Sequence, residues 1–200
     1  MVIVRRNRGK NLSARGSFMK DMQTVVDEMQ TWLEKAVIGL NLCPFAKAVH
    51  VKKQIRYQVS SAVTEEQLLR DLLSELQFLV KTQASEVDTT LLIHPQVLND
   101  FLDYNEFLET AEAALVELQL EGVIQVASFH PRYQFAGTAA DDITNYTNRS
   151  PYPALHLLRE ESITRAVDSF PDVESIPEKN IETMRALGLK GWKKLGIPGS

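Results

Sequence analysis

The sequence predicts a single α/β domain with a three- or four-stranded, mainly parallel or mixed sheet and helices packed on it. Two observations support this prediction. Segments with strand-like and helix-like patterns alternate along the chain, which is typical of crossover connections between strands. Two of the strand-like segments are almost continuously apolar, as expected for a sheet that is covered on both faces. A ferredoxin-like α+β arrangement is the alternative.

The first periodic segment covers residues 21–40, where apolar side chains recur every three or four residues and predict a helix. Pro44 then follows the end of this helix or begins a short new one. The two placements predict opposite reactivities for Cys43. Amides at the start of a helix lower a thiol pKa, whereas carbonyls at the end of a helix raise it.

Three strand-like segments follow, separated by two helix-like segments. The strands are expected over residues 55–59, 89–93 and 123–129. The first helix begins with a capping box, Thr-Glu-Glu-Gln, at Thr64 and continues with a leucine-rich face. The second helix is expected to begin at a cap formed by Asn99 or Asp100 and to be closed by Gly122.

The second and third strands each end in a His-Pro pair, at His94-Pro95 and His130-Pro131. If the helix between them makes a right-handed crossover, the two strands run in the same direction. Both histidines then lie at the carboxyl edge of the sheet. Open α/β sheets bind their ligands at that edge.

The last part of the chain is expected to add a fourth strand and two helices. Their expected ranges are 153–158, 160–170 and 177–188. One longer helix beginning at Pro153 also fits the pattern, but we prefer the strand. Trp192 lies in the basic stretch that follows, and it is expected to dock on the body of the domain.

Charge divides the chain into three expected parts. They are a basic arm over residues 1–18, a globular domain over residues 19–188 and a basic tail over residues 189–200. The formal net charge is −4 although the arm contains no acidic residue, so the body is acidic. A nucleic-acid partner is therefore not expected, because nucleic-acid-binding domains usually carry a basic face. The arm is expected to be disordered.

Other features limit the location and the chemistry. No apolar run is long enough to cross a bilayer, so membrane insertion is not expected. The chain has no secretory signal, and the cytoplasm is the expected compartment. Cys43 is the single cysteine, which excludes an intramolecular disulfide and a multi-cysteine zinc site. The sequence identifies no cofactor and leaves the oligomeric state open.

The segment from Ser128 to Arg159 is the strongest candidate for a functional site. Its middle shows neither a helical nor an alternating period, yet the segment contains five aromatic residues. Long connections inside compact domains are usually functional or disordered, and this composition argues against disorder. We therefore predict an ordered, polar, site-forming loop.

Several stretches in and before this loop form a distinctive pattern. They are Asn41-Leu-Cys-Pro-Phe45, His130-Pro-Arg-Tyr-Gln-Phe135, Asp141-Asp142, Asn145-Tyr-Thr-Asn-Arg-Ser-Pro-Tyr-Pro153 and His156-Leu-Leu-Arg-Glu160. In this pattern the chain resembles the bacterial family known as domain of unknown function 1415. The resemblance covers the chain from about Met19. It implies membership of that family and no particular activity.

In the first functional hypothesis, the protein is an enzyme or a binder that acts on a small anionic metabolite, phosphorylated or carboxylated. Arginines would bind the anion, a histidine would act as general acid or base, and asparagines would orient the substrate. The expected catalytic residues are His130, His156, Asp141 and Cys43. The expected substrate-binding residues are Arg132, Asn145, Asn148, Arg149 and Arg159. Cys43 would be a nucleophile only if it packs against the loop.

Two alternatives stay open. A metal-dependent enzyme would use His130 and His156 with Asp141 or Asp142, although their spacing matches no short metal-binding motif. In the other alternative, the loop is structural and the protein is a non-catalytic or partner-binding module. Asp141 and Asp142 would then cap a short helix, and side-chain-to-backbone hydrogen bonds would hold the Asn-Arg-Ser-Pro turn. The arginines would pair with the aspartates.

Overall fold

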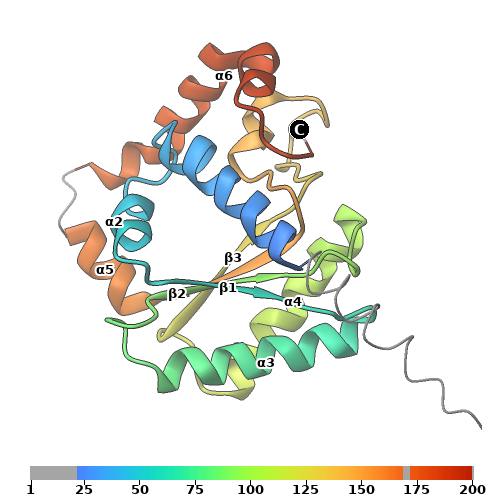
Figure 1. Ribbon diagram of the computed structural model, residues 1–200, viewed down its shortest axis with the longest axis vertical. Helices are drawn as coiled ribbons and strands as arrows, with labels where there is room; N and C mark the ends of the chain where they lie inside the picture. The colour runs from blue at the N-terminus through green and yellow to red at the C-terminus, as the bar shows by residue number, and fades with distance from the viewer. Residues whose placement is uncertain (1–21, 169–171, 200) are drawn as a thin grey trace, which may run out of the picture.

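The computed structural model describes residues 22–168 and 172–199, so the basic arm predicted over residues 1–18 lies outside the described residues. Its centre is one four-stranded sheet with helices on both faces (Figure 1). The strands are β1 (Ile55–Val59), β2 (Thr89–Ile93), β3 (Ile124–Phe129) and β4 (Ala154–Arg159). They lie in the order β1-β2-β4-β3. The predicted single α/β domain with a mixed sheet is confirmed.

Strand direction follows the sequence-based expectation, with β4 inserted between β2 and β3. β1 and β2 are parallel, and β4 is antiparallel to both of its neighbours, so β2 and β3 run the same way. Ile93 and Phe129 both pair with Ala154. The residues that follow them, His94 and His130, therefore lie at one edge of the sheet, as predicted.

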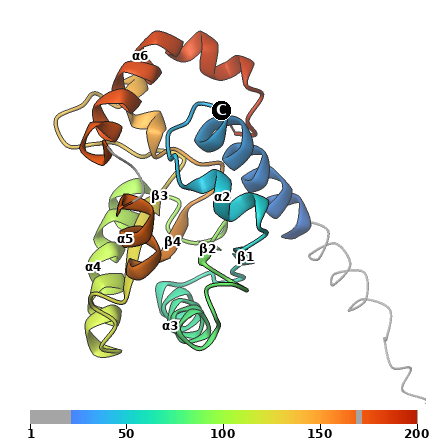
Figure 2. The same cartoon turned by 90° about the vertical axis from the view of Figure 1, so that its left-hand side faces the viewer.

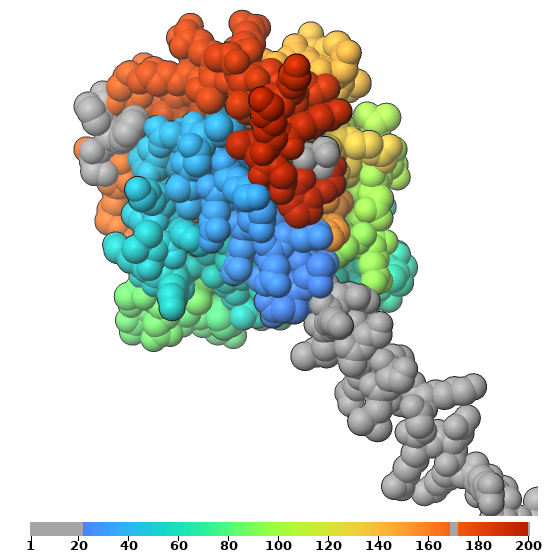
Figure 3. Space-filling model, turned by 45° about the horizontal axis from the view of Figure 1, so that its top comes forward, coloured from blue at the N-terminus to red at the C-terminus, as the bar shows by residue number. Residues whose placement is uncertain are grey.

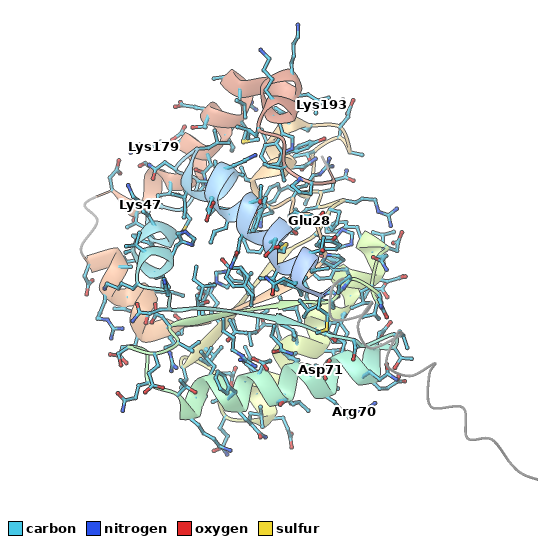
Figure 4. All side chains as sticks on the ribbon, in the orientation of Figure 1. Glu28, Lys47, Arg70, Asp71, Lys179 and Lys193 are labelled. Atoms are coloured by element: carbon cyan, nitrogen blue, oxygen red, sulfur yellow. The ribbon has the colours of Figure 1, made fainter. Side chains whose placement is uncertain are left out.

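One helical layer consists of α3 (Glu65–Lys81) and α4 (Phe101–Glu117). Thr64 caps α3 by accepting a hydrogen bond from the Gln67 amide, and Asp100 caps α4 in the same way. Arg70 and Asp71 are labelled on α3 in Figure 4, and the Asp71 carboxylate accepts a hydrogen bond from the Ser60 hydroxyl. The leucines of α3 that are fully buried against the sheet are Leu68, Leu72, Leu76 and Leu79.

The helix α4 ends earlier than the sequence predicts. Its last residue is Glu117, whereas the prediction placed the end at Gly122. Gln119 adopts the left-handed conformation, with φ of 57°, and the Leu120 amide donates to the Leu115 carbonyl. This turn buries Leu120 in the core, which offsets the cost of the left-handed conformation at a residue other than glycine.

The other face of the sheet is covered by residues from both ends of the chain. They form an α-helix over residues 22–32, the π-helix η1 (Leu33–Ile38), α2 (Ala46–Val51) and α6 (Ile176–Lys194). Figure 2 shows α2 and the first helix on the side of the sheet away from α3. The sequence predicted one regular helix over residues 21–40 and did not predict the π-helical part.

The two ends of the described chain lie side by side (Figure 3). The Asn180 side chain donates a hydrogen bond to the Leu42 carbonyl, and the Lys35 ammonium lies 3.5 Å from the Gly196 carbonyl oxygen. Gly188 interrupts α6 with φ of 62° and ψ of 170°, at the residue where the sequence predicted its end. Beyond this kink the helix continues and buries Trp192, as expected for a docked tail.

The remaining elements are short. They are η2 (Ile143–Thr147), α5 (Glu160–Asp168) and η3 (Val173–Ser175). The predicted strand after the long loop is β4, so the alternative of one longer helix from Pro153 is wrong. None of the helices that the structure describes has the length and apolar composition needed to cross a membrane.

Candidate functional site

A cavity of about 880 Å³ lies between the sheet and the elements η1, α2 and α5. Its volume falls in the range of small-molecule sites, which are mostly apolar with a few polar groups. The floor consists of side chains from the sheet, namely Ile55, Thr89, Leu91, Gln125, Ala127, Phe129, His156 and Leu158. The walls include Trp32, Leu33, Val37, Phe45, Ala48, Val49, Ile163 and Ala166.

The sheet register places His156 in the middle of this floor. His156 pairs with Leu91 of β2 and with Ala127 of β3. Directly paired residues point to the same face of a sheet, so these three side chains form one row across the floor. The imidazole is half-buried, and the Phe129 ring lies 6.1 Å from it between ring centres.

Hydrogen bonds fix the tautomer of His156. The Thr89 hydroxyl donates its one hydrogen to the Leu157 carbonyl oxygen at 2.6 Å. The same hydroxyl lies 2.6 Å from His156 Nε2, so it accepts a hydrogen bond from that nitrogen. His156 Nδ1 therefore carries a lone pair, and it accepts no hydrogen bond from the residues that the structure describes. Burial lowers the pKa of His156 to about 4, so the ring is neutral near pH 7.

Charged residues line the cavity away from its floor. Lys52, Arg159 and Arg165 are cationic, and Asp88 is the one carboxylate among the described lining residues. Lys52 is the C-cap residue of α2, and helical spacing places it on one face with the N-cap residue Phe45 and with Ala48 and Val49, which also line the cavity. In the described part of the chain, Lys52 has no ion pair.

Cys43 also lines the cavity, where the chain passes from η1 to α2. The backbone amides of Phe45 and Ala46 lower the pKa of the thiol, but burial has the larger effect and raises it overall. No hydrogen bond joins Cys43 to His156 in the part of the chain that the structure describes. The thiol is therefore in its protonated form near pH 7, which does not favour a nucleophile.

Thiol labelling of Cys43 is expected to be slow. At neutral pH the folded protein should react with a maleimide at least about tenfold more slowly than free cysteine, because the thiolate is rare and Cys43 is partly buried. Unfolding the protein in urea should restore the rate of free cysteine. A rate in the folded protein equal to that of free cysteine would contradict this prediction.

His130, at the sheet edge, is fully buried and engaged through both ring nitrogens. Nδ1 accepts a hydrogen bond from the Arg132 amide, and Nε2 donates to the Leu98 carbonyl. His94 is also fully buried, and both imidazoles lie beside the Tyr104 ring, at 5.7 Å for His94 and 5.0 Å for His130. Burial lowers the pKa of each histidine to about 4.

Asparagines of the long loop hydrogen-bond the backbone of the loop itself and of the neighbouring strand. Asn145 is fully buried, and its side-chain oxygen accepts hydrogen bonds from the Phe135 amide and the Thr138 hydroxyl. Its amide nitrogen donates to the Ala139 carbonyl. The Asn148 amide nitrogen donates to the carbonyl of Ser128 on β3. These bonds explain how a segment with little regular structure is ordered.

The three arginines predicted to bind an anion are hydrogen-bonded to backbone carbonyls. Arg132 binds the Asn99 carbonyl and the Asp100 carboxylate. Arg149 binds the carbonyls of Tyr133 and Ala140, and its guanidinium lies 4.4 Å from the centre of the Tyr146 ring. The guanidinium of Arg159 binds the carbonyls of Leu79, Thr82 and Val87.

The structure thus divides the predicted site residues into two groups. Cys43, His156 and Arg159 line the cavity. The others lie in or beside the long loop and are not among the lining residues, namely Arg132, His130, Asp141, Asn145, Asn148 and Arg149. Asp141 is exposed, and its neighbour Asp142 caps η2. In the described parts of the chain, no group of three or more His, Cys, Asp and Glu side chains is placed to hold a metal ion.

Several cavity residues were missed by sequence reasoning. The apolar pattern of residues 89–93 predicts a strand that contains Thr89 but assigns Thr89 no role, and Lys52 is not among the predicted site residues. A signal for Lys52 was present in the helical spacing Phe45, Ala48, Val49, Lys52, which places a cation on an otherwise apolar face. The face to which Thr89 points depends on sheet register, which no local pattern reveals.

A model of the protein family described as a protein of unknown function (DUF1415) matches residues 24–194. Comparison with curated proteins and with solved structures gave no match.

Proposed function

The chain belongs to the DUF1415 family, whose description names no activity, and we propose on the basis of the cavity that it binds a small molecule with an apolar body and an anionic group. The single observation that carries this proposal is the cavity of about 880 Å³ with His156 on its floor. The apolar body of the ligand would fill the space between Trp32, the sheet and α5. The anionic group would meet the cationic lining residues.

The local backbone supports a site at this place. The lining residues Leu33 and Val37 belong to the π-helix η1. Short π-helical stretches cost stability relative to a regular helix and are frequent at functional sites. A regular α-helix over the same residues would present different side chains to the cavity, because each residue turns by a different angle.

His156 is proposed as a binding residue rather than as a general base. A general base that works near neutral pH has a pKa close to that pH. Burial places the pKa of His156 at about 4, so the imidazole is a weak base and a good neutral acceptor. Thr89 holds the ring in one tautomer, which keeps the Nδ1 lone pair available to a ligand.

Filling the cavity is expected to abolish ligand binding. We suggest 1-anilinonaphthalene-8-sulfonate as the probe, because it combines an apolar body with one negative charge. The wild-type protein should bind it saturably at one site, and Ala127→Trp should weaken binding by at least about tenfold, because the indole occupies the floor beside His156. Titration followed by fluorescence measures both affinities.

The matched control is Ala113→Trp, an exposed position on α4 on the opposite side of the sheet. This variant should bind the probe like the wild type. Circular dichroism and thermal unfolding establish that both variants fold. Equal binding by Ala127→Trp and the wild type, or no saturable binding by the wild type, would refute the proposed function.

A further inference from the structure

The polar groups of the cavity narrow the ligand class, and this step rests on the proposed function. We infer that the ligand is a hydroxylated carboxylic acid with an apolar body, whose carboxylate binds Lys52 and whose hydroxyl donates a hydrogen bond to His156 Nδ1. The inference rests on the two polar groups that one largely apolar cavity offers: the Lys52 ammonium is a hydrogen-bond donor, and His156 Nδ1 is a hydrogen-bond acceptor.

The first argument is electrostatic. The chain as a whole has a formal net charge of −4, but three cations and one carboxylate line the cavity. Asp88 accepts a hydrogen bond from the Ser162 hydroxyl, which in turn accepts one from Arg165. A cationic lining in an acidic protein attracts anions to the cavity against the overall charge.

The second argument concerns which cation is available. The Arg159 guanidinium is occupied by three backbone carbonyls, and Arg165 forms an ion pair with Glu161. Lys52 has no ion pair in the described part of the chain. It is an exposed residue at the C-cap of α2 that lines the cavity, so its alkyl stem lies along the wall while its ammonium group stays in contact with water.

A single lysine suits one carboxylate better than a phosphate ester. A phosphate carries more charge and more acceptor oxygens, and proteins usually bind it with bidentate arginines or several backbone amides. The arginines that would fill this role are committed to carbonyls or to a carboxylate. The ligand class is therefore a carboxylic acid rather than a phosphorylated metabolite.

The third argument concerns the floor. His156 Nδ1 is an acceptor, because Nε2 carries the ring proton and donates a hydrogen bond to the Thr89 hydroxyl. A carboxylate at this point would face a lone pair, whereas a hydroxyl would donate to it. A site that hydrogen-bonds a ligand hydroxyl discriminates strongly against the analogue without it, because the buried acceptor then stays unpaired.

Isothermal titration with matched ligands tests the inference. A series of ω-hydroxy fatty acids of increasing chain length is titrated first, and the tightest member is compared with the unhydroxylated acid, the corresponding diol and the corresponding alkyl phosphate. The hydroxy acid should bind at least about tenfold more tightly than each of the other three.

Two variants test which residue binds the carboxylate and which binds the hydroxyl. Lys52→Met should weaken binding of the hydroxy acid by at least about tenfold and leave binding of the diol unchanged, since only the acid has a carboxylate that contacts the ammonium. His156→Phe should remove the preference for the hydroxy acid over the unhydroxylated acid. Lys47→Met is the matched control, because Lys47 lies on α2 (Figure 4) but is not among the residues that line the cavity.

The outcomes separate this inference from the proposed function. If the diol or the unhydroxylated acid binds as tightly as the hydroxy acid, or if Lys52→Met weakens acid and diol equally, the inference is wrong. If none of these ligands binds while the naphthalene sulfonate does, the inference is also wrong and the proposed function stands. If the sulfonate does not bind either, both fail.

Discussion

Lowering the pH from about 7 to about 4 is expected to lower the free energy of unfolding by several kcal/mol. Three of the four histidines, His94, His130 and His156, have a pKa lowered to about 4 in the folded protein, mainly by burial. In the unfolded chain a histidine titrates near its ordinary pKa of about 6.5. Between these values the unfolded chain binds more protons, so stability falls as the pH falls.

Each site has a specific reason to resist protonation. A proton on His130 Nδ1 would oppose the Arg132 amide that donates to it, beside the positive charges of Arg132 and Arg149. In His94, Nδ1 donates to the Val97 carbonyl, and Nε2 is buried without a partner among the described residues. His156 faces an apolar cavity. For His130, the Asp100 carboxylate acts in the opposite direction, but its effect is smaller than that of burial.

Urea unfolding at a series of pH values measures this effect. The slope of the free energy of unfolding against pH gives the number of protons that the chain takes up on unfolding, and this number should approach about three near pH 5. Each of His94→Gln, His130→Gln and His156→Gln should lower it by about one. His50→Gln is the control, because His50 is the histidine outside this group of three and lies 3.4 Å from the carboxylate of the exposed residue Glu34. An unchanged slope in all three variants would exclude these histidines as the cause.

Much of the fold was predictable because it depends on patterns that are local in sequence. The alternation of strands and helices, the caps at Thr64 and Asp100, and the common direction of β2 and β3 all follow from short-range rules. The position of β4 between β2 and β3 did not follow, because strand order depends on which apolar faces pack together. The π-helical turns of η1 did not follow either, since their side chains keep a nearly helical spacing.

The candidate site was harder to predict, for a physical reason. Polar side chains that bind a ligand and polar side chains that satisfy a loop backbone have the same composition. In the long loop, Asn145 and Arg149 are engaged by backbone groups of that loop. His156 was identified as a candidate, but its role depends on the direction in which its strand turns it. That direction is set by pairing with Leu91 and Ala127, which lie far away in sequence.

The substitution Asn145→Ala is expected to lower the free energy of unfolding by about 3 kcal/mol, because it removes three hydrogen bonds that hold the loop, each contributing about 1 kcal/mol. The Phe135 amide, the Ala139 carbonyl and the Thr138 hydroxyl each lose their hydrogen bond to this side chain. The Ala139 carbonyl keeps the hydrogen bond from the Asp142 amide, and the Thr138 hydroxyl keeps the Phe135 carbonyl as its acceptor. Asn145 itself has no exposed surface, so water does not replace these bonds without opening the loop.

The matched control is Asn105→Ala, which makes the same chemical change at an exposed position of α4. Alanine has the higher helix propensity, so this variant should be unchanged or more stable by up to about 0.5 kcal/mol. Urea unfolding of both variants gives the two free energies. Hydrogen exchange adds a local readout, since the Phe135 amide should exchange faster only in Asn145→Ala. If both variants unfold like the wild type, the loop is ordered by something other than Asn145. Its polar side chains would then again be candidates for ligand binding.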